Sequence, residues 1–220
     1  AVEHQLGDFG KGQRGSVTLA ANPTAITQFL APLLADFSGK YPNIQLHLEE
    51  KNSLSITREL AAGKLDIGIF TQIPYQDDIE VAHFRTDTLI VLVPAGHPLA
   101  KRDKVSFRET LSYSHITLTA GTQLNYQLIN AARAESANVR IDIETSGYDA
   151  MCVLINANMG IGILPEGCVD LYRVPDTARV KLDEEWAERK ILIGARRIRD
   201  LSASARQVFD FLSENNDSIL

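Results

Sequence analysis

Residues 15–24 read GSVTLAANPT, and they join an apolar strand to the start of a helix. Asn22 is a favoured helix cap, and Pro23 suits the first helical position because its missing N–H would have no partner there. The free N–H groups at such a helix start attract small anions. The junction therefore predicts the beginning of an α/β unit and, beside it, a candidate anion site.

Helices and strands alternate in the segment that follows this junction. Residues 44–48 alternate as a strand, residues 55–63 form a short helix that ends at a glycine, and residues 65–70 form the next strand. The first helix carries apolar side chains spaced for one face, namely Ile26, Phe29, Leu30, Leu33, Leu34 and Phe37. Pro32 is expected to bend this helix near Gln28. The β-α-β-α-β order predicts a parallel sheet with right-handed crossovers.

The rest of the chain continues the alternation, which favours the α/β class. A polar segment at residues 85–88 separates two apolar runs, residues 79–84 and 89–93, and predicts that the second run begins a different sheet. Ser146 and Asp149 have the spacing of a capping box, which predicts the start of a helix. Further strands are expected at residues 115–118, 139–143, 160–165, 180–182 and 191–193, and further helices at 107–111, 124–135 and from about 202. The last strand and helix are assigned to the first unit, so the chain would cross between two units twice.

The composition is that of a globular protein large enough to bury a core, with 220 residues of which 45% are hydrophobic. No run approaches the roughly 20 apolar residues of a membrane span. The first 14 residues lack the apolar stretch of a signal peptide, so the protein is expected to be cytoplasmic or to have lost a signal. The formal charge of -6, with Lys and Arg scattered singly, argues against this chain gripping a DNA backbone itself.

The side chains that most often carry chemistry form no recognisable catalytic or metal-binding pattern. The five histidines show no spacing that places two on one helical turn, and no nucleophile elbow, phosphate loop or complete dinucleotide fingerprint follows a strand. We therefore expect no enzyme, no metal and no cofactor. Cys152 and Cys168, predicted to lie in a helix and a turn, are interpreted as free thiols, with Cys152 in the core.

The order of these pieces resembles the effector-binding domain of LysR-type transcriptional regulators over residues 15–212. Each matching motif is weak by itself, but their order and intervals together are specific. The motifs are residues 15–19, Phe37 with Tyr41 and Pro42, residues 60–69, His97 with Pro98 and Leu99, and residues 159–165.

The resemblance implies a fold similar to type 2 periplasmic binding proteins, in which two Rossmann-like subdomains are joined by two crossover strands and hold a small molecule in the cleft between them. The implied parts are a linker remnant at residues 1–14, subdomain I at 15–84 with 189–220, and subdomain II at 85–188. It also implies a cytoplasmic homodimer, a tetramer in the full-length protein, no membrane contact, and DNA binding only through a winged helix-turn-helix that this chain lacks. In the family, the first helix of one domain pairs with the second subdomain of the other.

In α/β sheets a ligand binds at the carboxyl ends of parallel strands, and in LysR-type regulators the same positions line the effector cleft. The candidate ligand-binding residues are Asn22, Pro23, Thr24, Asn52, Phe70, Thr71, Thr119, Gly121, Thr122 and Gln123. Their hydroxyl, amide and N–H groups suit a carboxylate or another small anion. Plain N-capping and ordinary turn polarity stay open as alternatives. Lys51 is interpreted as a solvated lysine beside Glu49 and Glu50.

Two other functions use the same kind of scaffold. A solute receptor of a transporter would have been exported as a monomer behind a signal peptide. An enzyme would place perturbed acids or bases in the cleft, where this sequence predicts hydroxyls, amides and backbone donors. The preferred interpretation is a small-molecule sensor of a transcriptional regulator, which acts by shifting a conformational equilibrium.

Overall fold

The protein is described by a computed structural model that covers residues 15–74 and 78–214. The described residues form two compact units, unit 1 with residues 15–85 and 190–214 apart from 75–77, and unit 2 with residues 86–189. The expected linker remnant at residues 1–14 lies outside the described part of the chain. Two strands, β4 (Glu80–Pro94) and β10 (Glu188–Ala195), contribute residues to both units.

Unit 1 opens with the parallel strands that the sequence predicts. β1 (Gly15–Ala21) lies between β2 (Ile44–Glu50) and β3 (Ile67–Thr71) and is parallel to both, and β10 pairs antiparallel with β3. The helical segments of this unit are α1 (Pro23–Ala25), η1 (Ile26–Leu30), α2 (Ala31–Lys40), α3 (Ser53–Ala61), η4 (Ile198–Asp200) and α8 (Ala203–Glu214). The β-α-β-α-β prediction is confirmed.

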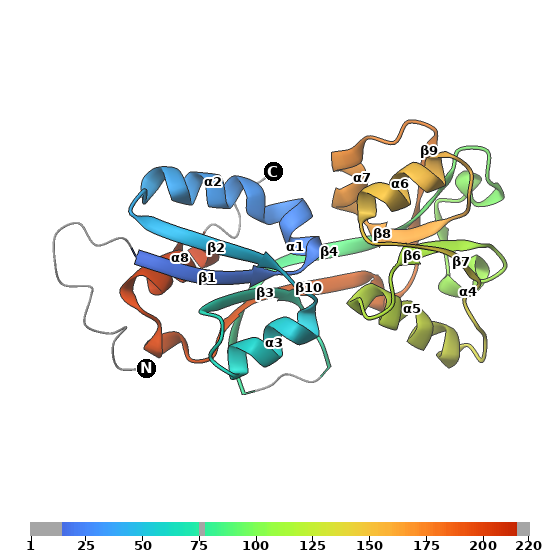
Figure 1. Ribbon diagram of the computed structural model, residues 1–220. Helices are drawn as coiled ribbons and strands as arrows, with labels where there is room; N and C mark the ends of the chain where they lie inside the picture. The colour runs from blue at the N-terminus through green and yellow to red at the C-terminus, as the bar shows by residue number, and fades with distance from the viewer. Residues whose placement is uncertain (1–14, 75–77, 215–220) are drawn as a thin grey trace. The chain divides into compact units, whose positions relative to one another are not determined.

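Helices cover both faces of this sheet, with α2 on one side and α3 on the other (Figure 1). Alternate residues of β3 supply the two cores. Ile67 and Ile69 belong to the cluster that includes apolar residues of α2 and α8, whereas Phe70 packs with Ile56 and Leu60 of α3. The side-chain period of two in a strand explains this division.

The first helix contains a π-helical turn, η1, where the sequence predicted a bend near Gln28. Pro32 follows this turn at the start of α2 and has no N–H to donate to the preceding turn. A π-helical turn widens the backbone locally and so accommodates the missing hydrogen bond. The predicted apolar stripe lies on the core side, since Leu30, Leu33 and Phe37 are buried.

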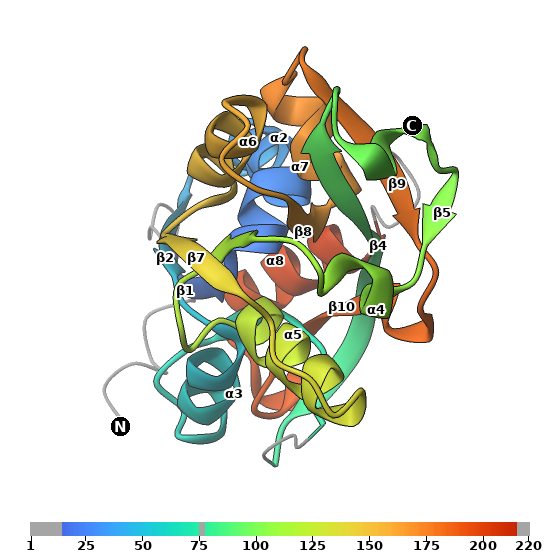
Figure 2. The same cartoon turned by 90° about the vertical axis from the view of Figure 1, so that its right-hand side faces the viewer.

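Unit 2 is built on β4, which pairs antiparallel with β8 (Gly162–Pro165) and β9 (Thr177–Leu182). β5 (Lys104–Val105) is parallel to β9, and β6 (His115–Leu118) is parallel to β7 (Ile141–Thr145). The helical segments are η2 (Pro98–Lys101), α4 (Phe107–Thr110), α5 (Gln123–Ala134), α6 (Tyr148–Asn156), α7 (Glu166–Tyr172) and η3 (Glu185–Ala187). Figure 2 shows α5 and α6 on either side of β7, and apolar residues of both helices share one core.

Three local predictions were wrong. The apolar runs at residues 79–84 and 89–93 are not separated by a break, because residues 80–94 form one strand, β4, in which Asp87 is buried in an ion pair with Arg189. The second run does pair with strands of unit 2, β8 and β9, and the units divide between Arg85 and Thr86, so the expected change of unit near residues 85–88 is confirmed. Gly147, not Ser146, is the N-cap of α6, and it makes no side-chain cap hydrogen bond. Cys168 lies in α7 and not in a turn.

Candidate functional site

In unit 1, Asn22 lies at the carboxyl end of β1 and joins three elements through its side chain. Its Oδ1 accepts a hydrogen bond from the Ala25 N–H at 3.0 Å, which caps α1. Its Nδ2 donates to Thr71 Oγ1 at 2.8 Å, at the end of β3, and to Ser53 Oγ at 3.3 Å, at the start of α3. Asn22, Ser53 and Thr71 are all buried. The ends of two parallel strands and the starts of two helices therefore meet at this amide.

The direction of these hydrogen bonds decides what the cluster offers to a ligand. Both amide protons of Asn22 are used, so its side chain is a structural link, and the capping interpretation of this residue is correct. Because the hydroxyl oxygens of Ser53 and Thr71 accept from Asn22, each hydroxyl keeps its own proton to donate. Ser53 follows the helix cap Asn52 after the end of β2, one of the strand ends at which a ligand was expected.

The other candidates of unit 1 have different surroundings. Asn52 caps α3 by accepting from the Ser55 N–H at 2.9 Å. Pro23 is the first residue of α1, and Thr24 beside it is buried. Phe70 has none of its surface exposed, because its ring packs in the core beneath α3. Its side chain serves packing, which leaves only its backbone for a ligand.

Lys51 is held by two carboxylates. Its Nζ lies 2.8 Å from Glu49 Oε2 and 2.6 Å from Glu59 Oε2. The hydrogen bonds to Glu49 and Glu59 raise the pKa of the lysine above its ordinary value. The ammonium is therefore neutralised locally, as the interpretation of a solvated lysine predicted, although Glu59 and not Glu50 is the second partner.

In unit 2, the candidates Thr119, Gly121, Thr122 and Gln123 form the turn between β6 and α5. Thr122 is the N-cap of α5, with its Oγ1 donating to the Thr119 carbonyl at 3.1 Å and accepting from the Asn125 N–H at 3.3 Å. Gly121 has a φ of +92°, in the region that favours glycine. Thr119 and Gly121 are exposed, and Thr122 and Gln123 are half-buried. This turn presents the first N–H groups of a 12-residue helix to its surroundings.

Cys152, Cys168 and His115 are buried in the core of unit 2. Cys152 and Cys168 are both free and buried, as predicted for Cys152. Burial and the charge of Asp149 raise the pKa of Cys152 to about 11, and burial raises the pKa of Cys168 further, which disfavours the reactive thiolate in both. Burial lowers the pKa of His115, whose Nδ1 lies 3.0 Å from the Tyr113 carbonyl. Across residues 15–74 and 78–214, no group of three or more His, Cys, Asp or Glu side chains could hold a metal ion.

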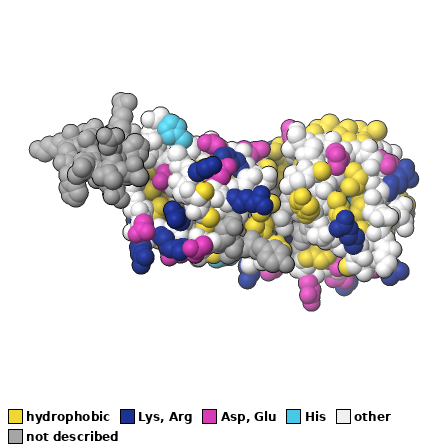
Figure 3. Space-filling model, turned by 60° about the horizontal axis from the view of Figure 1, so that its bottom comes forward, with side chains coloured by type: hydrophobic (Ala, Val, Ile, Leu, Met, Phe, Trp, Pro, Cys, Tyr) yellow, Lys and Arg dark blue, Asp and Glu magenta, His cyan; other side chains and the backbone are white. Residues whose placement is uncertain are grey.

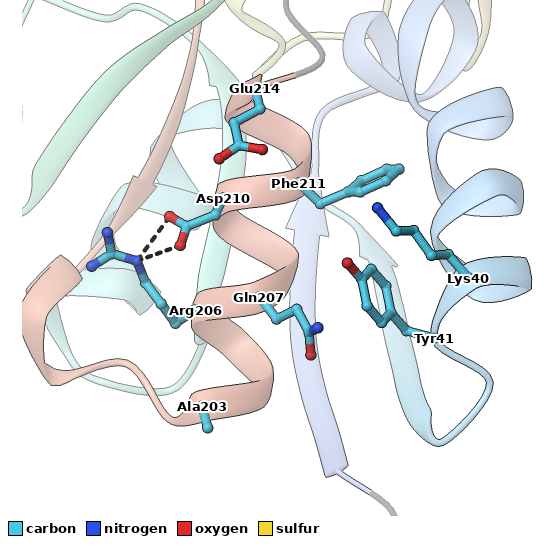
Figure 4. Close-up of a pocket in the computed structure, with 8 residues that line it drawn as sticks. All are labelled: Lys40, Tyr41, Ala203, Arg206, Gln207, Asp210, Phe211 and Glu214. Atoms are coloured by element: carbon cyan, nitrogen blue, oxygen red, sulfur yellow. Dashed lines mark hydrogen bonds and ion pairs between the residues drawn. The ribbon is translucent and has the colours of Figure 1, made fainter.

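A groove of about 660 Å³ lies in unit 1 between the end of α2 and the outer face of α8. Its residues, shown in Figure 4, are Lys40, Tyr41, Ala203, Arg206, Gln207, Asp210, Phe211 and Glu214. The Lys40 ammonium lies 5.4 Å from the Tyr41 ring centre and 5.9 Å from that of Phe211. Arg206 donates to both carboxylate oxygens of Asp210. None of these residues was a predicted site residue, so the groove is separate from the cluster around Asn22.

The charged side chains of the surface are mixed in sign. On the face shown in Figure 3, Lys and Arg side chains are interspersed with Asp and Glu side chains. Several basic residues are paired, among them Arg197 with Asp78 at 2.6 Å and Lys104 with Asp183 at 2.7 Å. Within the described ranges, no helix is both long enough and apolar enough to cross a membrane.

Curated relatives of this chain include transcriptional regulators. It is 28% identical over 186 residues to the uncharacterized HTH-type transcriptional regulator YybE of Bacillus subtilis (strain 168), covering 84% of this chain and 62% of YybE. The chain thus spans less than two thirds of that relative's length.

Solved structures show the same fold. The effector binding domain of QuiR in complex with shikimate matches with a TM-score of 0.79 and 23% identity, over 94% of this chain and 100% of that one. The regulatory domain of Synechocystis PCC6803 CcmR in complex with 2-PG matches with a TM-score of 0.81 and 22% identity, over 93% and 99%. The expected type 2 periplasmic-binding-protein-like fold is confirmed. The family model for the LysR substrate binding domain matches residues 10–217, and this chain belongs to that family.

Proposed function

We propose that this chain is the sensor part of a LysR-type transcriptional regulator and that it binds a small anionic metabolite with the candidate residues described above. The observation that carries the proposal is the cluster at Asn22, where one buried amide orients the hydroxyls of Ser53 and Thr71 beside two helix starts. The second set of donors is the turn from Thr119 to Gln123. Neutral hydrogen-bond donors and the positive ends of helix dipoles can bind a carboxylate, so such a site needs no buried Lys or Arg.

Binding would act by linkage. A metabolite that binds one arrangement of the units more tightly shifts the population toward that arrangement. The shift in free energy cannot exceed the difference between its binding free energies for the two arrangements. In the full-length protein, DNA contact is assigned to a helix-turn-helix outside this chain, and the cytoplasm is the compartment such a regulator requires. The mixed surface charge and the overall charge of -6 support a part that leaves the DNA phosphates to another domain.

The two alternative functions have less support. Membership of a regulator family and the match to YybE favour a regulator over the solute receptor of a transporter. The neutral hydroxyl and amide groups at the candidate positions favour binding over catalysis, which would need perturbed acids or bases there. We propose that no bond is made or broken by this chain.

We also propose that the chain forms a homodimer, and the full-length protein a tetramer. On the first helix, Ile26, Phe29 and Leu34 are half-buried, so each leaves part of an apolar side chain exposed. In unit 2, Val153 of α6 is 65% exposed and Leu171 of the neighbouring α7 is 57% exposed, which supports this unit as a partner surface.

Analytical ultracentrifugation is expected to show a dimer for the wild type. The double variant Val153→Glu/Leu171→Glu should dissociate this dimer into monomers. A monomeric wild type would contradict the proposal.

A thermal-shift screen of organic acids, shikimate among them, tests the ligand class, because a molecule that binds only the folded state raises Tm. The acid with the largest shift is then titrated by calorimetry into variants that lose a hydroxyl proton. Ser53→Ala and Thr71→Val are expected to weaken binding about tenfold each, the usual effect of losing one such hydrogen bond to a charged group.

The matched control is Thr57→Val. Thr57 is also buried in unit 1, but its hydroxyl donates to the Leu54 carbonyl at 3.1 Å and serves α3 alone. Its variant should bind the acid as the wild type does. The proposal is wrong if no organic acid raises Tm, or if Ser53→Ala and Thr71→Val bind the acid as tightly as Thr57→Val.

A further inference from the structure

A buried ion pair joins β4 and β10, the strands that contribute to both units, on the unit 2 side of the division. Arg189 donates from Nε to Asp87 Oδ1 at 2.9 Å, and its terminal NH2 group contacts Oδ2 of the same carboxylate. The side chains are 5% and 1% exposed. A two-point contact of this kind fixes the direction of the guanidinium as well as its position. Removing one partner would leave the other as a buried charge without a counter-ion, which would destabilise the fold.

The same guanidinium holds the start of α6. The Tyr148 side chain is hydrogen-bonded to Arg189, and Tyr148 is buried as the first residue of this helix. Burial alone would lower the pKa of Arg189, but the charge of Asp87 and the contact with Tyr148 raise it above its ordinary value. The guanidinium therefore stays charged across the physiological pH range.

A series of hydrogen bonds leads from the start of α6 to the candidate ligand turn. Thr145 Oγ1 donates to the carbonyl of Gly147, the N-cap of α6, at 3.1 Å. The Thr145 carbonyl accepts from the Thr119 N–H at 2.9 Å. The Thr119 carbonyl accepts from Thr122 Oγ1 at 3.1 Å. All of these residues lie in unit 2, so the series runs within one compact body.

We propose that Tyr148 is a positioning residue that couples the ligand turn at Thr119–Gln123 to β4 and β10 through the Asp87–Arg189 pair. A change at the turn moves the Thr145–Gly147 segment, and Tyr148, the first residue of α6, moves with it. Because Tyr148 contacts Arg189, the geometry of the ion pair between β4 and β10 then changes. β4 and β10 are the strands that run from one unit into the other. The ion pair is therefore the contact through which the ligand turn acts on these two strands. The inference rests on the proposed function in that the turn contacts the effector.

The test needs no ligand, because the side chain of Arg189 reports on the pair directly. Its Nε–H gives a resonance in a proton–nitrogen correlation spectrum, assigned by its loss in Arg189→Lys. Thr122→Ala removes the first hydroxyl of the series. It is expected to speed solvent exchange of this Nε–H about tenfold, because the loss of one hydrogen bond lowers the free energy of local opening. In a Tyr148→Phe background, Thr122→Ala should have no further effect.

Thr177→Ala is the matched control, because Thr177 Oγ1 also donates to a carbonyl three residues earlier in unit 2, that of Val174 at 2.8 Å, but lies outside the series. It should leave the Arg189 signal unchanged. Thr145→Val breaks the series at another point and replaces Tyr148→Phe if that variant does not fold. The proposal is overturned if folded Thr122→Ala leaves the exchange rate unchanged, or if its effect is equally large with Tyr148→Phe or Thr145→Val. A failed metabolite titration would count against the proposed function alone.

Discussion

Among single residues, Asn22 has the largest structural role of the predicted site residues, because its amide serves three elements at once. Asn22→Ala is expected to lower the free energy of unfolding by about 2–3 kcal/mol, since it removes a helix cap and leaves two buried hydroxyls without their donor. Asn52→Ala, which removes the exposed cap of α3, should cost only about 1 kcal/mol. Urea unfolding followed by circular dichroism measures both. Equal losses would mean that the contacts to Ser53 and Thr71 contribute nothing.

His115 makes stability depend on pH. Burial lowers its pKa in the folded protein, partly opposed by the Tyr113 carbonyl, so the folded state disfavours the proton that the unfolded chain accepts below about 6.5. Stability is therefore full above pH 6.5 and falls as the pH drops below it. His97, whose pKa burial also lowers, acts in the same direction. His115→Gln should flatten the fall in unfolding free energy between pH 7.5 and 5.5. An unchanged pH dependence would contradict this assignment.

At the scale of elements, the contact between β3 and α3 depends on a glycine. A Cβ added to Gly68 would lie 2.4 Å from Ile56 Cγ2 and 2.8 Å from Leu60 Cδ1, both fully buried. Gly68→Ala is expected to cost about 2 kcal/mol, as overpacking of a core usually does. In α2, a Cβ at Gly39 would meet nothing within 4 Å, so Gly39→Ala should instead stabilise by about 0.5 kcal/mol. Thermal unfolding of both variants tests the opposite signs.

At the scale of the whole molecule, the two units should unfold together, because β4 and β10 run without interruption through both. The single tryptophan, Trp186, packs against Phe107 in unit 2 and reports on that unit alone. Gly68→Ala disturbs unit 1, yet it is expected to shift the urea midpoint of Trp186 fluorescence as far as that of circular dichroism. A fluorescence midpoint that stays at the wild-type value would mean that the units unfold independently.

The sequence by itself determined the β-α-β-α-β order of unit 1, its three parallel strands and the buried stripe of the first helix, because these follow from local periodicity and helix-end residues. Only the tertiary structure decided that the apolar runs at residues 79–84 and 89–93 lie in one strand. It also decided that the amide of Asn22 donates its hydrogen bonds to Ser53 and Thr71. The physical reason is distance along the chain. Asp87 looks like a solvated residue until Arg189, 102 positions away, supplies the partner that allows its burial.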